Sequence, residues 1–202
     1  MRKLLCTVVL CALTAIPAIA QGGAPAGGGA QMAPPTDPLS TFVKGAFKSI
    51  STNLIGSAEQ MPEANFSMKI GTMPEVRTYG SLLGHVIDAN YLFCAQAKGE
   101  PDPATMKYET TQQTKDQLVK AMHAALDYCG EVYNSQTDAT IMAMVTPIGQ
   151  NGPGRPALRA AVLIRNLGHN NEEYGNIVGY FRAANLVPPS TAAAAGGGRR
   201  GN

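Results

Sequence analysis

The chain has 202 residues and a formal net charge of +2, and 45% of its residues are hydrophobic while 15% are charged. This length suits about one domain. The nearest approach to a basic cluster is Arg199-Arg200 in a Gly-rich tail, so we expect no nucleic-acid partner.

The first twenty residues have the pattern of an export signal. Arg2 and Lys3 precede an apolar stretch, and residues 18–20 (Ala-Ile-Ala) form the small-x-small pattern that signal peptidase cleaves. The apolar stretch is shorter than the about 20 residues that a membrane span needs. We therefore expect cleavage before Gln21 and export to the periplasm or the exterior, with no stable membrane span afterwards. An uncleaved membrane anchor is the alternative.

The composition divides the remaining chain into three parts. Residues 21–36 are rich in Gly, Ala and Pro and predict a flexible linker. Residues 37–190 have the length of one domain. Residues 191–202 (TAAAAGGGRRGN) resemble the linker in composition and predict a disordered tail.

The domain begins with a helical pattern. Asp37 is a capping acid and Pro38 suits the first helical position, while Pro62 marks the stop. Apolar residues recur at spacings of three and four and predict one buried stripe. These residues are Leu39, Phe42, Val43, Ala46, Phe47, Ile50, Leu54 and Ile55.

Three more helices follow. The second spans residues 78–99, and the third starts with the capping-box pattern TKDQ and covers 114–132. The fourth runs over about 156–184, because Pro188 and Pro189 prevent its continuation. Four amphipathic helices predict an all-α four-helix bundle. The expected buried positions are Tyr79, Leu82, Val86, Ala89 and Phe93 in the second helix, and Leu118, Met122, Ala125, Cys129 and Val132 in the third.

The connection between the second and third helices is long. Residues 99–111 exceed what a tight antiparallel connection requires, and at about 3.3 Å per residue they can cross the bundle. The two helices can therefore run parallel. In that arrangement Cys94 and Cys129 approach the same end, whereas an antiparallel pair would separate them by roughly 20 Å. We predict a Cys94–Cys129 disulfide, with two buried free thiols as the alternative.

Three polar residues are candidates for a metal site. His169 and Glu173 are four residues apart, so a helix places them on one face. His85 adjoins the apolar stripe of the second helix and can project into the same space. Two imidazoles and one carboxylate suit zinc, nickel or iron(II) and leave positions open. The alternatives are a hydrogen-bonded core histidine at His85 and a solvated pair at His169 and Glu173.

Other residues have simpler interpretations. His123 falls off the apolar stripe of the third helix and is expected at the surface. Met142 and Met144 are expected to fill a hydrophobic gap. No Gly-rich phosphate loop fits the helical pattern, and no Gly-x-Ser-x-Gly elbow surrounds Ser51 or Ser81.

Two segments carry a family resemblance, VRTYGSLLGHVIDANYLFC in the second helix and GHNNEEYGNIVGYFRAANLVPP in the fourth. With them the chain resembles the DinB-like superfamily of metal-dependent four-helix proteins over nearly all of residues 37–190. The resemblance implies a long crossover between parallel second and third helices. It also implies one divalent metal, held by a histidine of the second helix and a His-x-x-x-His pair of the fourth. By position these ligands are His85 and His169, while Glu173 replaces the usual third histidine.

The replacement at Glu173 leaves two hypotheses open. Glutamate also ligates zinc or iron, and it favours harder metals than a third histidine does. The chain is then an exported metal-binding bundle, and the resemblance implies a metal-dependent transferase or hydrolase of unknown substrate. Alternatively the metal site has decayed, and the bundle binds a small ligand or a protein without catalysis. Bundle geometry also allows a homodimer.

Overall fold

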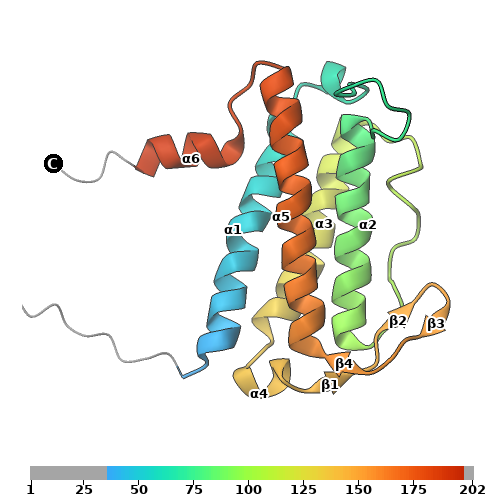
Figure 1. Cartoon of the computed structure of the whole chain (residues 1–202), viewed down its shortest axis with the longest axis vertical. Coiled ribbons are helices and arrows are strands. Elements are labelled where there is room, and N and C mark those ends of the chain that lie inside the picture. Colours follow the sequence, from blue (N-terminus) through green and yellow to red (C-terminus); the bar gives the residue numbers. More distant parts are fainter. Residues whose placement is uncertain (1–35, 198–202) are drawn as a thin grey trace, which may run out of the picture. The chain divides into compact units, whose positions relative to one another are not determined.

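The chain is described here from a computed structural model, which covers residues 36–197. The expected signal peptide and all but the last residue of the expected linker lie outside this range. Four long helices form the bundle (Figure 1). They are α1 (Pro38–Gln60), α2 (Tyr79–Lys98), α3 (Lys115–Asn134) and α5 (Arg159–Ala183).

Short elements occupy the connections. A 3-10 helix η1 (Glu63–Asn65) follows α1, and α4 (Asp138–Ile141) follows α3. Strands β1 (Met144–Val145) and β4 (Ala157–Leu158) form one antiparallel pair, and β2 (Ile148–Gly149) and β3 (Gly152–Pro153) form another. Because β4 takes up residues 157–158, α5 begins at Arg159 rather than near the expected Pro156.

The order of packing confirms the expected bundle. Helix α2 packs against α3 and α5, and α1 packs against the same two helices. Helices α2 and α3 run in the same direction, and the segment between them returns along the outside of the bundle (Figure 1). The predicted crossover is therefore present. Cys94 and Cys129 form a disulfide between these parallel helices, with their Cα atoms 5.4 Å apart.

The apolar stripes meet inside the bundle. Every position expected to be buried in the second and third helices is buried. In α1, Val43, Phe47, Ile50 and Leu54 are buried, but Phe42 is 70% exposed, so its expected burial was wrong. The cause is geometric, because Phe42 lies about 100° around the helix from Val43. None of the helices within residues 36–197 is long and apolar enough to cross a bilayer.

Two aspartates cap each other's helices. Asp37 makes no capping bond to α1 with its own side chain. Instead Asp138 of α4 accepts hydrogen bonds from the backbone N–H groups of Leu39 (3.2 Å) and Ser40 (2.7 Å), while Asp37 Oδ1 accepts from the N–H of Asp138 (2.8 Å). Asp37 therefore caps α4 rather than α1, so its expected capping of the first helix was wrong. The reciprocal bonds hold the start of α1 against α4.

A polar network crosses the apolar core between α2, α3 and α5. The side chains of Asn90 and Asn170 donate to each other at 2.9 Å, and Asn166 donates to Asn90 at 3.2 Å. Tyr133 donates to the Leu163 carbonyl at 2.7 Å. All three asparagines are fully buried. Since buried amides must be paired, the network favours one alignment of α5 against α2.

Two expectations about the periphery were wrong. Helix α6 (Pro189–Gly197) occupies much of the tail expected to be disordered, because Pro189 suits a helix start and the following alanines have high helix propensity. Met142 and Met144 are 51% and 59% exposed, because Ile141 and Val145 take the inward positions beside them.

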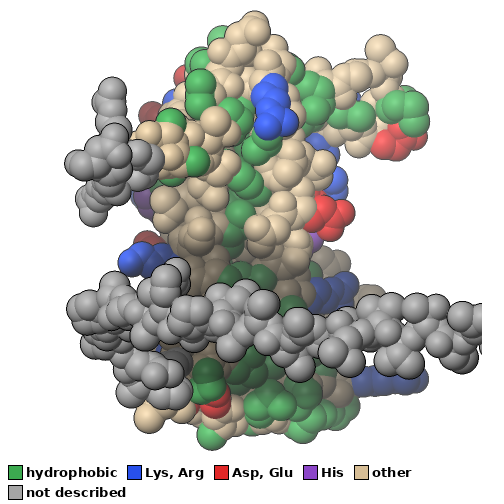
Figure 2. Space-filling view, turned by 60° about the vertical axis from the view of Figure 1, so that its left-hand side comes forward, with side chains coloured by type: hydrophobic (Ala, Val, Ile, Leu, Met, Phe, Trp, Pro, Cys, Tyr) green, Lys and Arg blue, Asp and Glu red, His purple; other side chains and the backbone are tan. Residues whose placement is uncertain are grey.

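Hydrophobic side chains gather at the end of the bundle that carries α4, at the bottom of Figure 2.

Candidate metal centre

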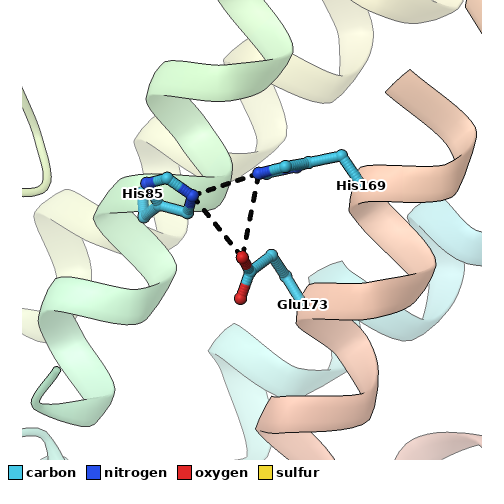
Figure 3. A group of neighbouring side chains, drawn as sticks. All are labelled: His85, His169 and Glu173. Atoms are coloured by element: carbon cyan, nitrogen blue, oxygen red, sulfur yellow. Dashed lines mark hydrogen bonds and ion pairs between the residues drawn. The ribbon is translucent and has the colours of Figure 1, made fainter. Parts of the chain in front are cut away.

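Three donor groups from two helices meet at one point. Helix α2 supplies His85, and one turn of α5 supplies His169 and Glu173 (Figure 3). The two Nε2 atoms are 3.0 Å apart, and Glu173 Oε1 lies 3.5 Å from His85 Nε2 and 3.8 Å from His169 Nε2. These three residues are the metal-ligand candidates predicted from the sequence. The structure brings their ligand atoms within 4.8 Å of one another.

These distances fit a tetrahedral metal site. Ligand atoms at about 2.0–2.1 Å from a zinc ion lie roughly 3.3–3.4 Å from one another in a tetrahedron. The three observed separations fall on either side of that value. The donor set also suits zinc, nickel and iron(II), since imidazole and carboxylate bind all three.

The carboxylate of Glu173 is buried and needs partners. Only 9% of its side chain is exposed. Asn176 Nδ2 donates to Oε2 at 3.0 Å, which leaves Oε1 directed at the two histidines. A buried carboxylate is costly unless hydrogen bonds or a cation compensate its charge. Its neighbour Glu172 is exposed, because it lies about 100° around the helix from Glu173.

His169 is held in its neutral form. Burial, followed by the proximity of His85, lowers its pKa below the ordinary value for histidine. The neutral imidazole is the form that binds metals. Its Nδ1 atom is buried and has no hydrogen-bond partner within residues 36–197, and the ring packs against Phe93 at 5.6 Å between centroids. Nε2 is thus the nitrogen that faces the other donors.

Two residues beside His85 were not found from the sequence. Glu109 Oε2 lies 2.8 Å from His85 Nδ1, and its Oε1 accepts from Arg77 Nε at 2.8 Å. Burial alone would raise the pKa of Glu109, but hydrogen bonds from Arg77 and His85 outweigh it and lower that pKa. Neither residue lies on a helix or in a periodic pattern. The signals available in the sequence were Gly84, directly before His85, and Asp88, three residues after it. A glycine on a helix allows another segment to approach closely there.

A small cavity adjoins Glu173, one of the three donors. It has a volume of about 280 Å³, with Ile70, Val76 and Leu82 as apolar walls. Arg77 and Glu173 also line it, so a molecule in this cavity would contact the carboxylate donor. By contrast, His123 of α3 is partly exposed and lies 2.8 Å from Glu59, in agreement with its predicted surface position.

The chain matches the family model of the DinB superfamily over residues 32–175, a range that includes all three donors. The comparison with curated proteins gave no match.

Solved structures of low sequence identity share the fold. A DinB-like protein from Bacillus cereus has a TM-score of 0.60 and 16% identity, over 73% of this chain and 93% of that chain. A DinB-like protein from Bacillus subtilis has a TM-score of 0.55 and 16% identity, over 72% and 93%. A mutant of the mycothiol-dependent maleylpyruvate isomerase has a TM-score of 0.52 and 10% identity, over 68% and 60%.

Proposed function

We propose that this chain, which belongs to the DinB superfamily, binds one divalent metal ion through His85, His169 and Glu173. The observation that carries the proposal is the convergence of two imidazole nitrogens and one carboxylate oxygen from separate helices. Packing alone does not require such a meeting, because apolar side chains and the separate asparagine network already fill the interior of the bundle. Zinc, nickel and iron(II) are the candidate ions.

The same geometry suits a metal-dependent transferase or hydrolase. When bound, a divalent ion lowers the pKa of a coordinated thiol or water and supplies a nucleophile at neutral pH. Three protein donors leave a fourth position for such a group. A cavity of about 280 Å³, lined by Arg77 and Glu173, lies beside one of the three donors and offers space for a small molecule. A neighbour in fold is named as a mycothiol-dependent isomerase, so thiol chemistry occurs on this architecture.

Metal content tests the proposal directly. We expect about one equivalent of a divalent metal in purified wild-type protein, measured by mass spectrometry, and a large loss in His169→Ala. His123→Ala is the matched control, since that histidine is partly exposed and lies on another helix, away from the donors. Metal contents near zero in the wild type, unchanged after incubation with zinc, nickel or iron(II), would exclude the metal site.

A second candidate is a bundle that binds a small ligand or protein without catalysis. It is favoured by Glu173 in place of the histidine usual in the family, and by a 3.0 Å contact between His85 and His169 that one N–H can bridge without a metal. This candidate predicts that Glu173→His creates metal affinity that the natural chain lacks. Stoichiometric metal in the unaltered protein would reject it.

We also propose that the protein is exported. The pattern of residues 1–20 supports this location, and a disulfide between Cys94 and Cys129 suits an oxidising compartment. Expression of the full chain in a bacterial host, followed by fractionation and N-terminal sequencing, tests it. We expect the exported form to begin at Gln21. A protein that retains Met1 inside the cell would contradict this location.

A further inference from the structure

The crossover between α2 and α3 is fastened to α2 beside His85. Asp88 accepts hydrogen bonds from two successive backbone N–H groups of the crossover, those of Tyr108 and Glu109, each at 3.0 Å. Ser81 donates to the carbonyl of Glu109 at 2.9 Å. Ser81 and Asp88 lie on the same face of α2, with Gly84 and His85 between them. This face of the helix therefore lies against the dipeptide Tyr108-Glu109.

Gly84 makes this close approach possible. A Cβ atom at this position would lie 2.4 Å from the carbonyl oxygen of Tyr108, and a carbon atom there cannot approach so closely. The contact is with backbone, so no side-chain rotation relieves it. A glycine immediately before His85 thus allows the crossover to lie directly on the helix.

The side chain of Glu109 extends from this anchored backbone to His85. Its Oε2 lies 2.8 Å from His85 Nδ1, and its Oε1 accepts from Arg77 Nε at 2.8 Å. Arg77 is held in turn, because the hydroxyl of Tyr180 donates to its carbonyl. The carboxylate therefore has little freedom to leave the imidazole.

This contact determines which nitrogen of His85 faces the other donors. An ionised carboxylate only accepts hydrogen bonds, so Nδ1 must carry the hydrogen. Arg77 Nη2 lies farther from Nδ1, at 3.4 Å, and a guanidinium has no lone pair to accept that hydrogen. In the neutral ring Nε2 then keeps its lone pair, and Nε2 is the atom that lies 3.0 Å from His169.

We propose that Glu109 is a positioning residue for the metal centre. It holds the Nδ1–H tautomer and the ring orientation of His85, so that Nε2 points at His169 and Glu173. The proposal rests on the proposed metal binding and extends it, because it assigns a role to the crossover itself. Carboxylate groups behind metal-binding histidines raise the basicity of the ligand, and their loss typically lowers metal affinity 10–100-fold.

Zinc titration of the full mature chain tests the proposal. Glu109→Gln keeps the size of the side chain and the hydrogen bonds of the residue's backbone but removes the charge, whereas Glu109→Ala removes the acceptor. We expect zinc affinity to fall about 10–100-fold in both variants. Glu100→Gln is the matched control, since it lies on the same crossover and pairs with Lys98 instead, and it should bind zinc as the wild type does.

A second readout needs no metal. In 15N-labelled metal-free protein, the imidazole nitrogen shifts should show His85 as the Nδ1–H tautomer in the wild type. Glu109→Ala should lose that preference. If Glu109 served only the fold, its replacement would leave the tautomer of His85 unchanged. Equal zinc affinities in wild type and both Glu109 variants, or an unchanged tautomer in Glu109→Ala, would overturn the proposal. A wild type that binds neither zinc, nickel nor iron(II) would instead reject the proposed function, and the role of Glu109 in the metal centre with it.

Discussion

The Nε2 atoms of His85 and His169 lie 3.0 Å apart, although 84 residues separate them in the chain. Two ring nitrogens reach this distance in one of two ways. Either one donates its hydrogen to the other, or both direct lone pairs at a shared cation. The two cases differ in how the protein responds to added metal.

Zinc should therefore stabilise the protein. A ligand that binds only the folded state at 100 times its Kd adds about 2.7 kcal/mol to the free energy of unfolding. For a domain of this size we expect Tm to rise by roughly 5–10 °C, measured by differential scanning fluorimetry. A chelator should reverse the shift. A double variant His85→Ala/His169→Ala should show no shift, and an equal shift there would place the zinc elsewhere.

Glu173→Gln should separate metal binding from stability. The substitution removes the charge of a buried carboxylate but keeps an oxygen and the shape of the side chain. We expect zinc affinity to fall roughly 10–100-fold or more. The Tm of the metal-free protein should stay the same or rise, because the cost of burying the charge disappears. A lower Tm with unchanged zinc affinity would show that Glu173 serves the fold alone.

The disulfide should account for a measurable part of the stability. It closes a loop with a sequence separation of 35 residues, for which loss of chain entropy in the unfolded state predicts about 3–4 kcal/mol. Cys94→Ala/Cys129→Ala should lower the free energy of unfolding by about this amount in urea titrations. The unreduced mature protein should show no reactive thiol under denaturing conditions. Two reactive thiols would contradict the bridge.

Asn90→Ala should destabilise the bundle more than its size suggests. Asn90 accepts from Asn166 and Asn170 and donates to Asn170, all inside the core. Each buried group left without a partner costs roughly 1–3 kcal/mol. Asn134→Ala at the exposed end of α3 is the control and should change Tm little. A small effect of Asn90→Ala in urea titrations would mean that the network is dispensable.

The reciprocal caps predict a pH-dependent effect. Hydrogen bonds from the backbone, first of all from Ser40, lower the pKa of Asp138 below its ordinary 3.8. A lowered carboxylate pKa stabilises the folded state above the unfolded pKa, and this contribution is lost as the pH falls through the folded pKa. Asp138→Asn should therefore have a lower Tm than the wild type at neutral pH, with the difference shrinking below about pH 4. A difference independent of pH would argue against an ionised cap.

The periodic features of the chain were predictable from the sequence. Apolar spacing located the first three long helices, and Pro188 with Pro189 limited the fourth. Thr114 with Gln117 marked the start of the third, where the structure has a capping box. The long connection between the second and third helices indicated the crossover, and the parallel helices that it allows brought Cys94 close to Cys129. Helical spacing paired His169 with Glu173, and bundle geometry together with the family resemblance added His85 to them.

Other contacts between distant segments were decided by the tertiary structure. Glu109 lies in an irregular crossover. The sequence around it does not predict that Asp88 and Gly84 allow it to lie against His85. Phe42 has the apolar character of a core residue, yet its angle on α1 leaves it exposed. Local spacing determines which face a side chain occupies on its own helix. Which segment then covers that face depends on how all the helices pack at once, and no short stretch of sequence contains that information.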